Sequence, residues 1–283
     1  MVRYYLVSAG ACMLESGIAR MYKYRLPRLW GELSAITKPV LTVPDLVPFD
    51  HYHYCGTEAI DVAVQRTGWQ SGAHLLDIGA GIGGTARYLA WRYGLRVTGI
   101  ELQPQLYEAG KFLTDRTGLA GQVHLYQGDF LVESPLHSQK FDGWIALMVF
   151  LHIPDRQTLF QRCAQVLKAG GRFYIEDYFQ QQPLTKAEQS TLAHEIACPY
   201  LPTQAEYIAQ LEQAGFRDIH FENVTPLWRW WVANRYQRFQ EQQAIYLQRH
   251  GTEMVNSYLQ FYGAVADLFA GGKLGGARIW GTI

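Results

Sequence analysis

Apolar positions between residues 57 and 224 follow two alternating patterns, one typical of strands and one typical of helices. Short apolar runs predict strands at 74–78, 96–100, 123–126, 141–147, 172–176 and 218–224. Apolar residues three or four positions apart predict a helix from 57 to near Gly68 and helices at 85–93, 105–116, 155–167 and 203–214. Strands that alternate with helices imply right-handed crossovers, so we expect an α/β fold whose parallel sheet is covered on both faces.

The two ends of the chain depart from this pattern. Residues 1–55 have no clean period, and prolines 39, 44 and 48 predict an extended connector. The first 16 residues are largely apolar but are interrupted by Glu15, and they favour an N-terminal helix of a cytoplasmic protein over a signal peptide. Residues 226–269 predict two helices broken near Gly251, inserted before a last strand at 277–283. No apolar run is long enough to predict a membrane span.

Composition narrows the class of protein. The chain has 283 residues, with 25 basic and 25 acidic side chains, and this balance argues against a general nucleic-acid binder. Aromatic residues make up 14%, which indicates a large apolar core or a flat pocket. The cysteines lack C-x-x-C spacing and read as free thiols: Cys12, Cys55, Cys163 and Cys198. No histidine pair has metal-ligand spacing with a nearby acid, so we expect no metal site.

A glycine-rich loop follows the first predicted strand. Asp77 is followed by Gly79, Gly81 and Gly83, and a helix is expected directly after them. Glycines allow the backbone to approach a ligand closely, and the start of a helix offers free N–H groups to an anion. The spacing of Gly79, Gly81 and Gly84 also satisfies the dinucleotide-binding pattern, so this loop alone is ambiguous.

Two further acids decide between these ligands. Glu101 ends the second strand, where its carboxylate can accept hydrogen bonds from both ribose hydroxyls. Asp129 ends the third strand, where it can accept from an adenine amino group, with Phe130 packing beside it. Asp77, two residues before the first glycine, suits an amino-acid ligand. One molecule, S-adenosylmethionine, contains all three groups.

At these residues the chain resembles the class I S-adenosylmethionine-dependent methyltransferases, over residues 52–221. Residues 168–173 resemble the turn before that family's fifth strand, with Ala169 where proline is usual. The resemblance implies a Rossmann-like seven-stranded sheet with an antiparallel last strand, and S-adenosylmethionine as cofactor with S-adenosylhomocysteine as product. It also implies that Leu102, Leu147 and Tyr54 contact the cofactor.

A narrower similarity is to sarcosine and dimethylglycine N-methyltransferases and to sterol and isoprenoid C-methyltransferases. It rests on residues 51–56 (His-Tyr-His-Tyr-Cys-Gly), on Gly-Gly-Thr-Ala-Arg at 83–87 and on Phe-Leu-His at 150–152. In that group the first segment closes over the cofactor. We therefore expect 1–55 to be an N-terminal extension and cofactor lid, and 56–283 to be the methyltransferase domain, with substrate-cap insertions at 178–202 and 225–274.

The sequence indicates the residues that contact the methyl acceptor less sharply than those that contact the cofactor. The catalytic candidates are His152, which follows strand four, and Glu176 and Tyr178, which end strand five at the same ligand-binding edge. His152 also suits loop packing. The substrate-binding candidates are His53, Trp228, Trp231 and Arg235. Trp228 and Trp231 share a helical face, so packing in the core competes with an aromatic roof over the acceptor.

We expect methyl transfer to a small-molecule acceptor, at an amine nitrogen as in sarcosine or dimethylglycine. C-methylation of an isoprenoid or sterol-like substrate and O-methylation are the alternatives, and a non-catalytic S-adenosylmethionine-binding protein is the alternative of another class. The sequence predicts neither the acceptor nor the oligomeric state.

Overall fold

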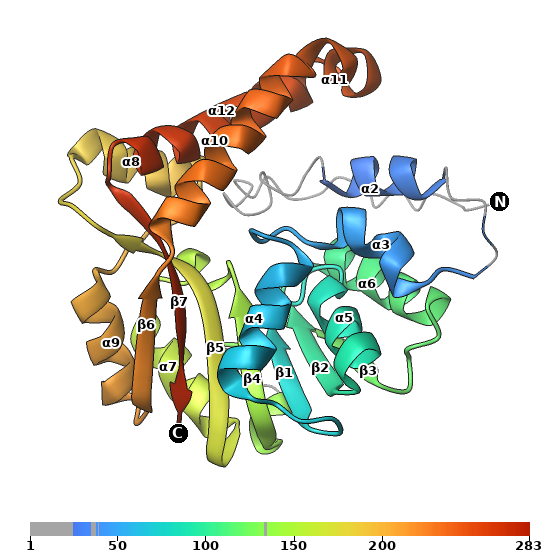
Figure 1. Ribbon diagram of the computed structural model, residues 1–283, viewed down its shortest axis with the longest axis vertical. Helices are drawn as coiled ribbons and strands as arrows, with labels where there is room; N and C mark the ends of the chain where they lie inside the picture. Colours follow the sequence, from blue (N-terminus) through green and yellow to red (C-terminus); the bar gives the residue numbers. More distant parts are fainter. Residues whose placement is uncertain (1–24, 35–37, 39, 133–134) are drawn as a thin grey trace.

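The strands form a single sheet, and the first strand of the chain lies near its middle. In the computed structural model, which describes residues 25–34, 38, 40–132 and 135–283, the order is β3-β2-β1-β4-β5-β7-β6 (Figure 1). The strands are β1 (His74–Ile78), β2 (Arg96–Glu101), β3 (Val123–Gln127), β4 (Phe141–Leu147), β5 (Leu167–Gln180), β6 (Arg217–Asn223) and β7 (Leu274–Thr282). Strands β1 to β5 pair in parallel, whereas β7 is antiparallel to β5 and β6. The predicted seven-stranded sheet with an antiparallel last strand is confirmed.

Helices cover both faces of this sheet. The described helices are α2 (Arg25–Ser34), α3 (Val43–Asp50), α4 (Thr57–Thr67), α5 (Gly84–Tyr93), α6 (Pro104–Arg116), η1 (Pro135–Ser138), η2 (Phe150–His152), α7 (Arg156–Gln165), α8 (Lys186–Glu195), α9 (Gln204–Gln213), α10 (Thr225–Glu241), α11 (Gln243–His250) and α12 (Thr252–Ala270). Leu75 and Ile145 pack with α4 and α5, while Leu76 and Trp144 pack with α7 and α9. Adjacent residues of a strand thus face opposite layers, which explains why these strands are apolar throughout.

Helices α10, α11 and α12 extend beyond the carboxyl edge of the sheet, and the chain then returns as β7 (Figure 1). Trp228 of α10 is fully buried. A Cβ atom added at Gly276 would lie 2.1 Å from Trp228 Cε3, so glycine is what allows α10 to rest this close to β7. The helical insertion before the last strand is confirmed, with a break at Gly251. A second break at Gln242, which we did not predict, separates α10 from α11.

Three segments differ from the prediction. The prediction of an extended connector around prolines 44 and 48 is wrong, because these residues lie in α3. Pro44 occupies the first turn, where its missing N–H is not needed, and Asp45 Oδ2 accepts from Thr42 N at 3.0 Å. Strand β5 begins at Leu167 rather than 172. Helix α8 was not predicted, because it buries only Leu192 and so has no amphipathic pattern.

Some expectations lie outside the described residues. These are the N-terminal helix, its signal-peptide alternative and Cys12. The other three cysteines, Cys55, Cys163 and Cys198, are free thiols. In the described part of the chain, no helix has the length and apolar character needed to cross a membrane.

Candidate active site

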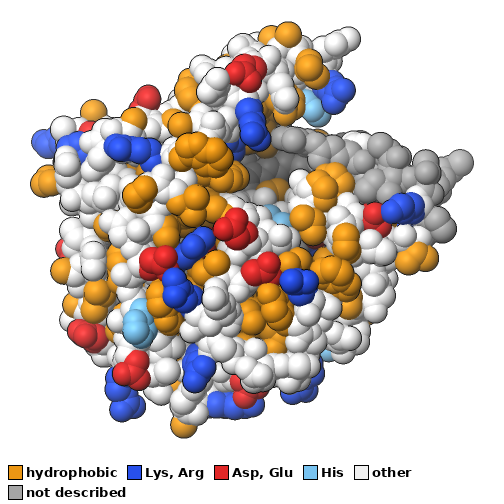
Figure 2. Space-filling view, in the orientation of Figure 1, with side chains coloured by type: hydrophobic (Ala, Val, Ile, Leu, Met, Phe, Trp, Pro, Cys, Tyr) orange, Lys and Arg blue, Asp and Glu red, His pale blue; other side chains and the backbone are white. Residues whose placement is uncertain are grey.

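A cavity of about 310 Å³ lies at the carboxyl ends of the central strands. Strand ends β1, β2 and β4 and the loop after β3 line one end, and α10, α12 and the segment before α4 line the other. The sequence-predicted residues that line it are His53, Tyr54, Asp77, Gly79, Gly81, Glu101, Leu102, Asp129, Phe130, Leu147, His152, Tyr178 and Arg235. On the face shown in Figure 2, acidic and basic side chains are interspersed, and the described residues there form no continuous basic surface.

The glycine loop after β1 has the geometry that its sequence indicates. Gly79 and Gly81 have φ angles of 73° and 55°, which favour glycine. A Cβ atom at Gly79 would lie 2.5 Å from Val149 Cγ2, whereas one at Gly81 would meet no atom within 4 Å. The Gly81 N–H donates to Glu101 Oε2 at 2.8 Å, which joins the loop to the end of β2. The loop thus borders open space that a ligand can fill.

Two buried carboxyl groups lie beside this loop. Glu101 also accepts from Gln103 N at 2.8 Å, so backbone donors hold both of its oxygens in place. Asp77 is only 3% exposed, and its Oδ2 has no hydrogen-bond partner. Burial, and secondarily the charge of Glu101, raises the pKa of Asp77 to about 7. An unpartnered carboxyl oxygen facing a cavity favours a ligand with a donor or a positive charge at this point.

Of the remaining predicted cofactor residues, all but Gly83 line the cavity. Asp129 is exposed, and its Oδ1 accepts from Leu131 N at 2.9 Å; Phe130 behind it is buried. Leu102 and Leu147 supply apolar walls on either side of the loop. Gly83 does not line the cavity: it is the N-cap residue of α5, and its Cβ position would lie 3.0 Å from the Arg87 guanidinium.

Aromatic side chains form the other end of the cavity. The hydroxyl groups of Tyr54 and Tyr178 share a short hydrogen bond, and both rings are buried. Burial raises the pKa of both phenols, so they are neutral at physiological pH. The Arg235 guanidinium lies 5.2 Å from the centre of the Tyr54 ring. This end therefore offers rings, hydroxyl groups and one cation.

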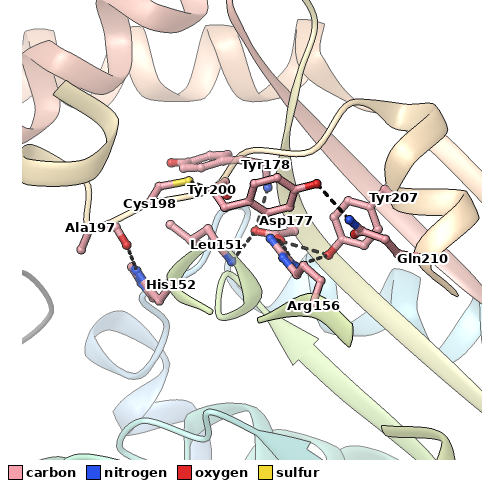
Figure 3. A network of polar contacts seen from close by, with 10 residues as sticks. All are labelled: Leu151, His152, Arg156, Asp177, Tyr178, Ala197, Cys198, Tyr200, Tyr207 and Gln210. Atoms are coloured by element: carbon pink, nitrogen blue, oxygen red, sulfur yellow. Dashed lines mark hydrogen bonds and ion pairs between the residues drawn. The ribbon is translucent and has the colours of Figure 1, made fainter. Parts of the chain in front are cut away.

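His152 lies at the cavity in a defined tautomer. Its Nδ1 is 2.8 Å from the carbonyl oxygen of Ala197 (Figure 3). A carbonyl only accepts, so Nδ1 carries a proton, and Nε2 is the ring nitrogen that can act as a base. Ala197 itself has a φ of 55°, which is uncommon for a residue with a side chain.

A buried polar network holds His152 and Tyr178 in place. Asp177 Oδ1 accepts from Leu151 N at 3.2 Å and from Tyr178 N at 2.9 Å, so it ties η2 to the end of β5 (Figure 3). Its Oδ2 accepts from Tyr207 Oη at 3.0 Å and pairs with Arg156 at 3.4 Å. Asp177 therefore joins two segments that border the cavity.

Besides Gly83, three predicted residues lie away from the large cavity. Glu176 is fully buried and pairs with Arg278 at 2.9 Å, on the sheet face opposite Asp177. Its pKa is raised to about 7 by burial, which Arg278 opposes. Trp228 packs against Tyr54, with ring centres 4.7 Å apart, and does not line the large cavity. Trp231 lines a smaller, second cavity.

The sequence reasoning did not identify the support for the segment before α4. Asp50 lines the large cavity, and its carboxylate pairs with the fully buried Arg87 at 2.7 Å. A Cβ atom at Gly84 would lie 2.6 Å from Asp50, so glycine lets this segment reach the start of α5. Gly84 and Arg87 lie within the Gly-Gly-Thr-Ala-Arg motif, which could have indicated this contact. Among the described residues, no cluster of His, Cys, Asp and Glu could hold a metal ion.

Known proteins share this sequence pattern and fold. Residues 76–175 match a methyltransferase domain family. O-methyltransferase resE of Aspergillus sclerotiorum is 31% identical over 183 residues, or 60% of this chain and 69% of that protein. Sarcosine/dimethylglycine N-methyltransferase of Halorhodospira halochloris is 29% identical over 153 residues, or 54% of each chain. The chain spans 54–69% of the length of the first curated relatives it matches.

A solved structure extends the similarity to three dimensions. Phosphoethanolamine N-methyltransferase 2 of Haemonchus contortus, in complex with phosphomonomethylethanolamine and S-adenosylhomocysteine, superposes with a TM-score of 0.74. The match covers 82% of this chain and 54% of that one at 22% identity, so it shows a shared fold. Together, the matched domain, its relatives and the sheet order show that this chain belongs to the class I S-adenosylmethionine-dependent methyltransferases.

Proposed function

We propose that this protein transfers the methyl group of S-adenosylmethionine to an amine nitrogen of a small-molecule acceptor. The observation that carries this proposal is the division of the large cavity. Asp77, Glu101 and Asp129 line it from the ends of β1 and β2 and the loop after β3, whereas His152 lines it from η2 and Tyr178 from β5. A molecule held along the three acids would place its reactive group toward the second end.

The residues of the first end suit the parts of the cofactor. We propose that Glu101 accepts from the ribose hydroxyls, that Asp129 accepts from the adenine amino group, and that Asp77 Oδ2 takes the amino group of the methionine portion. When bound, the cofactor supplies an activated methyl group. Alignment of the acceptor and exclusion of water are then the main tasks of the protein.

The second end can manage the acceptor's proton. An ammonium group must lose a proton before its nitrogen can attack, and His152 Nε2 is the basic nitrogen of a ring oriented by Ala197. Tyr54 and Tyr178 present hydroxyl oxygens that can hold the acceptor nitrogen by hydrogen bonds. We assign Glu176 no direct part, because it does not line the large cavity and its Oε1 is bound by Arg278 and Tyr174.

We further propose that two segments enclose the reaction. Tyr52, His53 and Tyr54 line the cavity between the sheet and α10, which supports a lid within residues 1–55. Arg235 and Phe261 line it from α10 and α12, and Ile196 lines it from the end of α8. These contacts support the assignment of residues 178–202 and 225–274 as substrate caps. A cytoplasmic location stays part of this proposal.

O-methylation is the second candidate. The relative resE carries that activity in its name, and a hydroxyl acceptor needs a base such as His152. C-methylation of an isoprenoid acceptor would instead use the aromatic rings near Tyr54.

One assay separates these candidates. Purified protein is incubated with S-adenosylmethionine and a panel of sarcosine, dimethylglycine, phosphoethanolamine, small phenols and prenyl diphosphates, and S-adenosylhomocysteine release is measured. We expect turnover with an amine. Turnover with phenols or prenyl diphosphates alone would select O- or C-methylation. Cofactor binding without any turnover would favour a non-catalytic binding protein, and binding of a nicotinamide dinucleotide instead of S-adenosylmethionine would overturn the proposal.

A further inference from the structure

A second cavity of about 170 Å³ adjoins the large one. The two share Tyr52, His53 and Arg235 in their linings, and the second is bordered in addition by His51, Trp231 and Tyr262. None of the proposed cofactor groups lies there. The second cavity is therefore placed to receive the part of an acceptor that lies away from the transferred methyl group.

Arg235, which is half-buried, differs from the buried arginines in the described part of the chain. Arg87, Arg156 and Arg278 each pair with a carboxylate, from Asp50, Asp177 and Glu176 respectively. Arg235 pairs with no carboxylate in the described part of the chain, and its Nε is buried without a hydrogen-bond partner.

Aromatic rings surround the Arg235 guanidinium instead. Its Cζ lies 4.4 Å from the centre of the Tyr262 ring and 4.7 Å from that of Trp231. Stacked rings fix a guanidinium and shield it from water, but they do not neutralise its charge. An ordered, partly desolvated guanidinium that borders two cavities favours an anionic ligand, which it can bind through two hydrogen bonds.

Two imidazoles add hydrogen-bonding groups to the same place. His51 and His53 lie with ring centres 5.0 Å apart, and both nitrogens of His51 are buried without partners. Burial lowers the pKa of the two rings to about 3 and about 4, so both are neutral at pH 7 and one nitrogen of His51 donates. His53 Nδ1 donates to the Tyr54 carbonyl oxygen at 3.1 Å, so its unpartnered Nε2 is an acceptor.

We infer that the methyl acceptor is a small anionic molecule whose carboxylate or phosphate binds Arg235 and His51 in the second cavity. His53 Nε2 then accepts from an amine or hydroxyl group of the same molecule at the junction of the two cavities. The link to methyl transfer rests on the proposed function, whereas the anion site itself does not.

The anion site is tested without knowledge of the acceptor. Inorganic phosphate and acetate are titrated separately into the protein at constant ionic strength, with and without S-adenosylhomocysteine, and binding is followed by calorimetry or by the histidine ring resonances. Loss of a charge-assisted hydrogen bond should weaken binding about tenfold or more in Arg235→Gln. His51→Ala, which removes no charge, should weaken it about threefold to tenfold. Arg238→Gln is the matched control, since Arg238 is an exposed cation on the same helix.

The outcomes distinguish the inference from the proposed function. Binding of phosphate but not acetate selects a phosphorylated acceptor, and binding of acetate selects a carboxylate. An unchanged affinity in Arg235→Gln, or binding of neither anion to the wild-type protein, overturns the inference even if S-adenosylmethionine binds. If S-adenosylmethionine does not bind while the anion effect of Arg235 persists, the proposed function fails and the anion site stands. Arg235→Lys keeps the charge and serves as a folded variant if Arg235→Gln is unstable.

Discussion

The two ends of the large cavity are built in different ways. At the proposed cofactor end, short-range backbone geometry places the groups: the Gly81 N–H, in the loop after β1, donates to Glu101, the last residue of β2. At the acceptor end, Tyr54 and Tyr178 meet although 124 residues separate them, and Arg235 reaches them from α10. The first end depends on the sheet alone, whereas the second depends on packing between the sheet, the segment before α4 and the cap helices.

This difference implies that the two ends can be disturbed separately. Substitutions at the strand ends should change cofactor affinity and leave the acceptor end intact. Substitutions around Tyr178 and His152 should change turnover while cofactor affinity is retained. The predictions below test that separation.

The largest effect is expected at the acceptor end. His152→Ala should lower kcat by about 10²–10⁴-fold, the usual range for loss of a general base, with cofactor affinity unchanged. Release of S-adenosylhomocysteine and calorimetric titration with the cofactor measure the two quantities. His194→Ala, on an exposed turn of α8, is the control. Full turnover by His152→Ala would remove this residue from the catalytic assignment.

The buried network around Asp177 should contribute strongly to the free energy of unfolding of the protein. Asp177→Ala leaves the buried Arg156 without its carboxylate and should lower the free energy of unfolding by about 3–5 kcal/mol in urea denaturation. Glu222→Ala breaks the exposed pair with Arg66 and should lower it by about 1 kcal/mol or less. Equal losses in the two variants would contradict the role of Asp177 as the link between η2 and β5.

At the cofactor end, Glu101→Ala should weaken S-adenosylmethionine binding by about 1.5–3 kcal/mol, the scale of hydrogen bonds to a charged group. Calorimetry with the cofactor measures this loss. Glu108→Ala, an exposed acid on α6, should have no effect. An unchanged affinity in Glu101→Ala would refute its ribose role.

The smallest effect is a pH dependence of cofactor affinity. The pKa of Asp77 is raised to about 7, so Asp77 is mostly protonated at pH 5.5. A cationic amino group favours the carboxylate, so cofactor affinity should rise as pH increases from 5.5 to 7 and level off above it, by at most about tenfold per pH unit. Because the pKa of Glu101 is also raised, the comparison with Asp77→Asn isolates Asp77, and a flatter profile is expected in that variant.

The same linkage applies to folding. The folded state holds the proton of Asp77 to a higher pH than the unfolded chain does, so this residue lowers stability as pH rises from about 4 to about 7. Asp77→Asn should therefore gain stability relative to wild type as pH increases across that window. A constant difference between the two proteins would contradict the raised pKa.

Most of the fold could be predicted from the sequence, and so could the grouping of Asp77, Gly79, Gly81 and Glu101 at one cavity, because both depend on local pattern. Leu75 and Leu76 of one strand face the helical layers on opposite sides of the sheet. A continuous apolar run between two helices is sufficient to predict this arrangement. The glycine loop and Glu101 lie next to predicted strand ends, so topology alone brings them together.

The acceptor end depended on contacts that no local pattern encodes. Glu176 was placed at the cavity from its position after strand five, but its side chain faces the other layer, where Arg278 lies 102 residues away along the chain. Trp228 and Trp231 share a helical face, yet one is buried core and the other lines a cavity. The packing of α10 against β7 determines which of the two tryptophans is buried.

That fit has a consequence for how the protein can change. Because Trp228 occupies the space above Gly276 and also touches Tyr54, a side chain at 276 would push on the cap helices and, through Tyr54, on the acceptor end. If the proposed cap role of α10–α12 is right, these helices and strand β7 should change together when the acceptor changes. An exchange of cap helices between relatives should succeed only when the crossover lies beyond β7, so that the strand travels with the helices it supports.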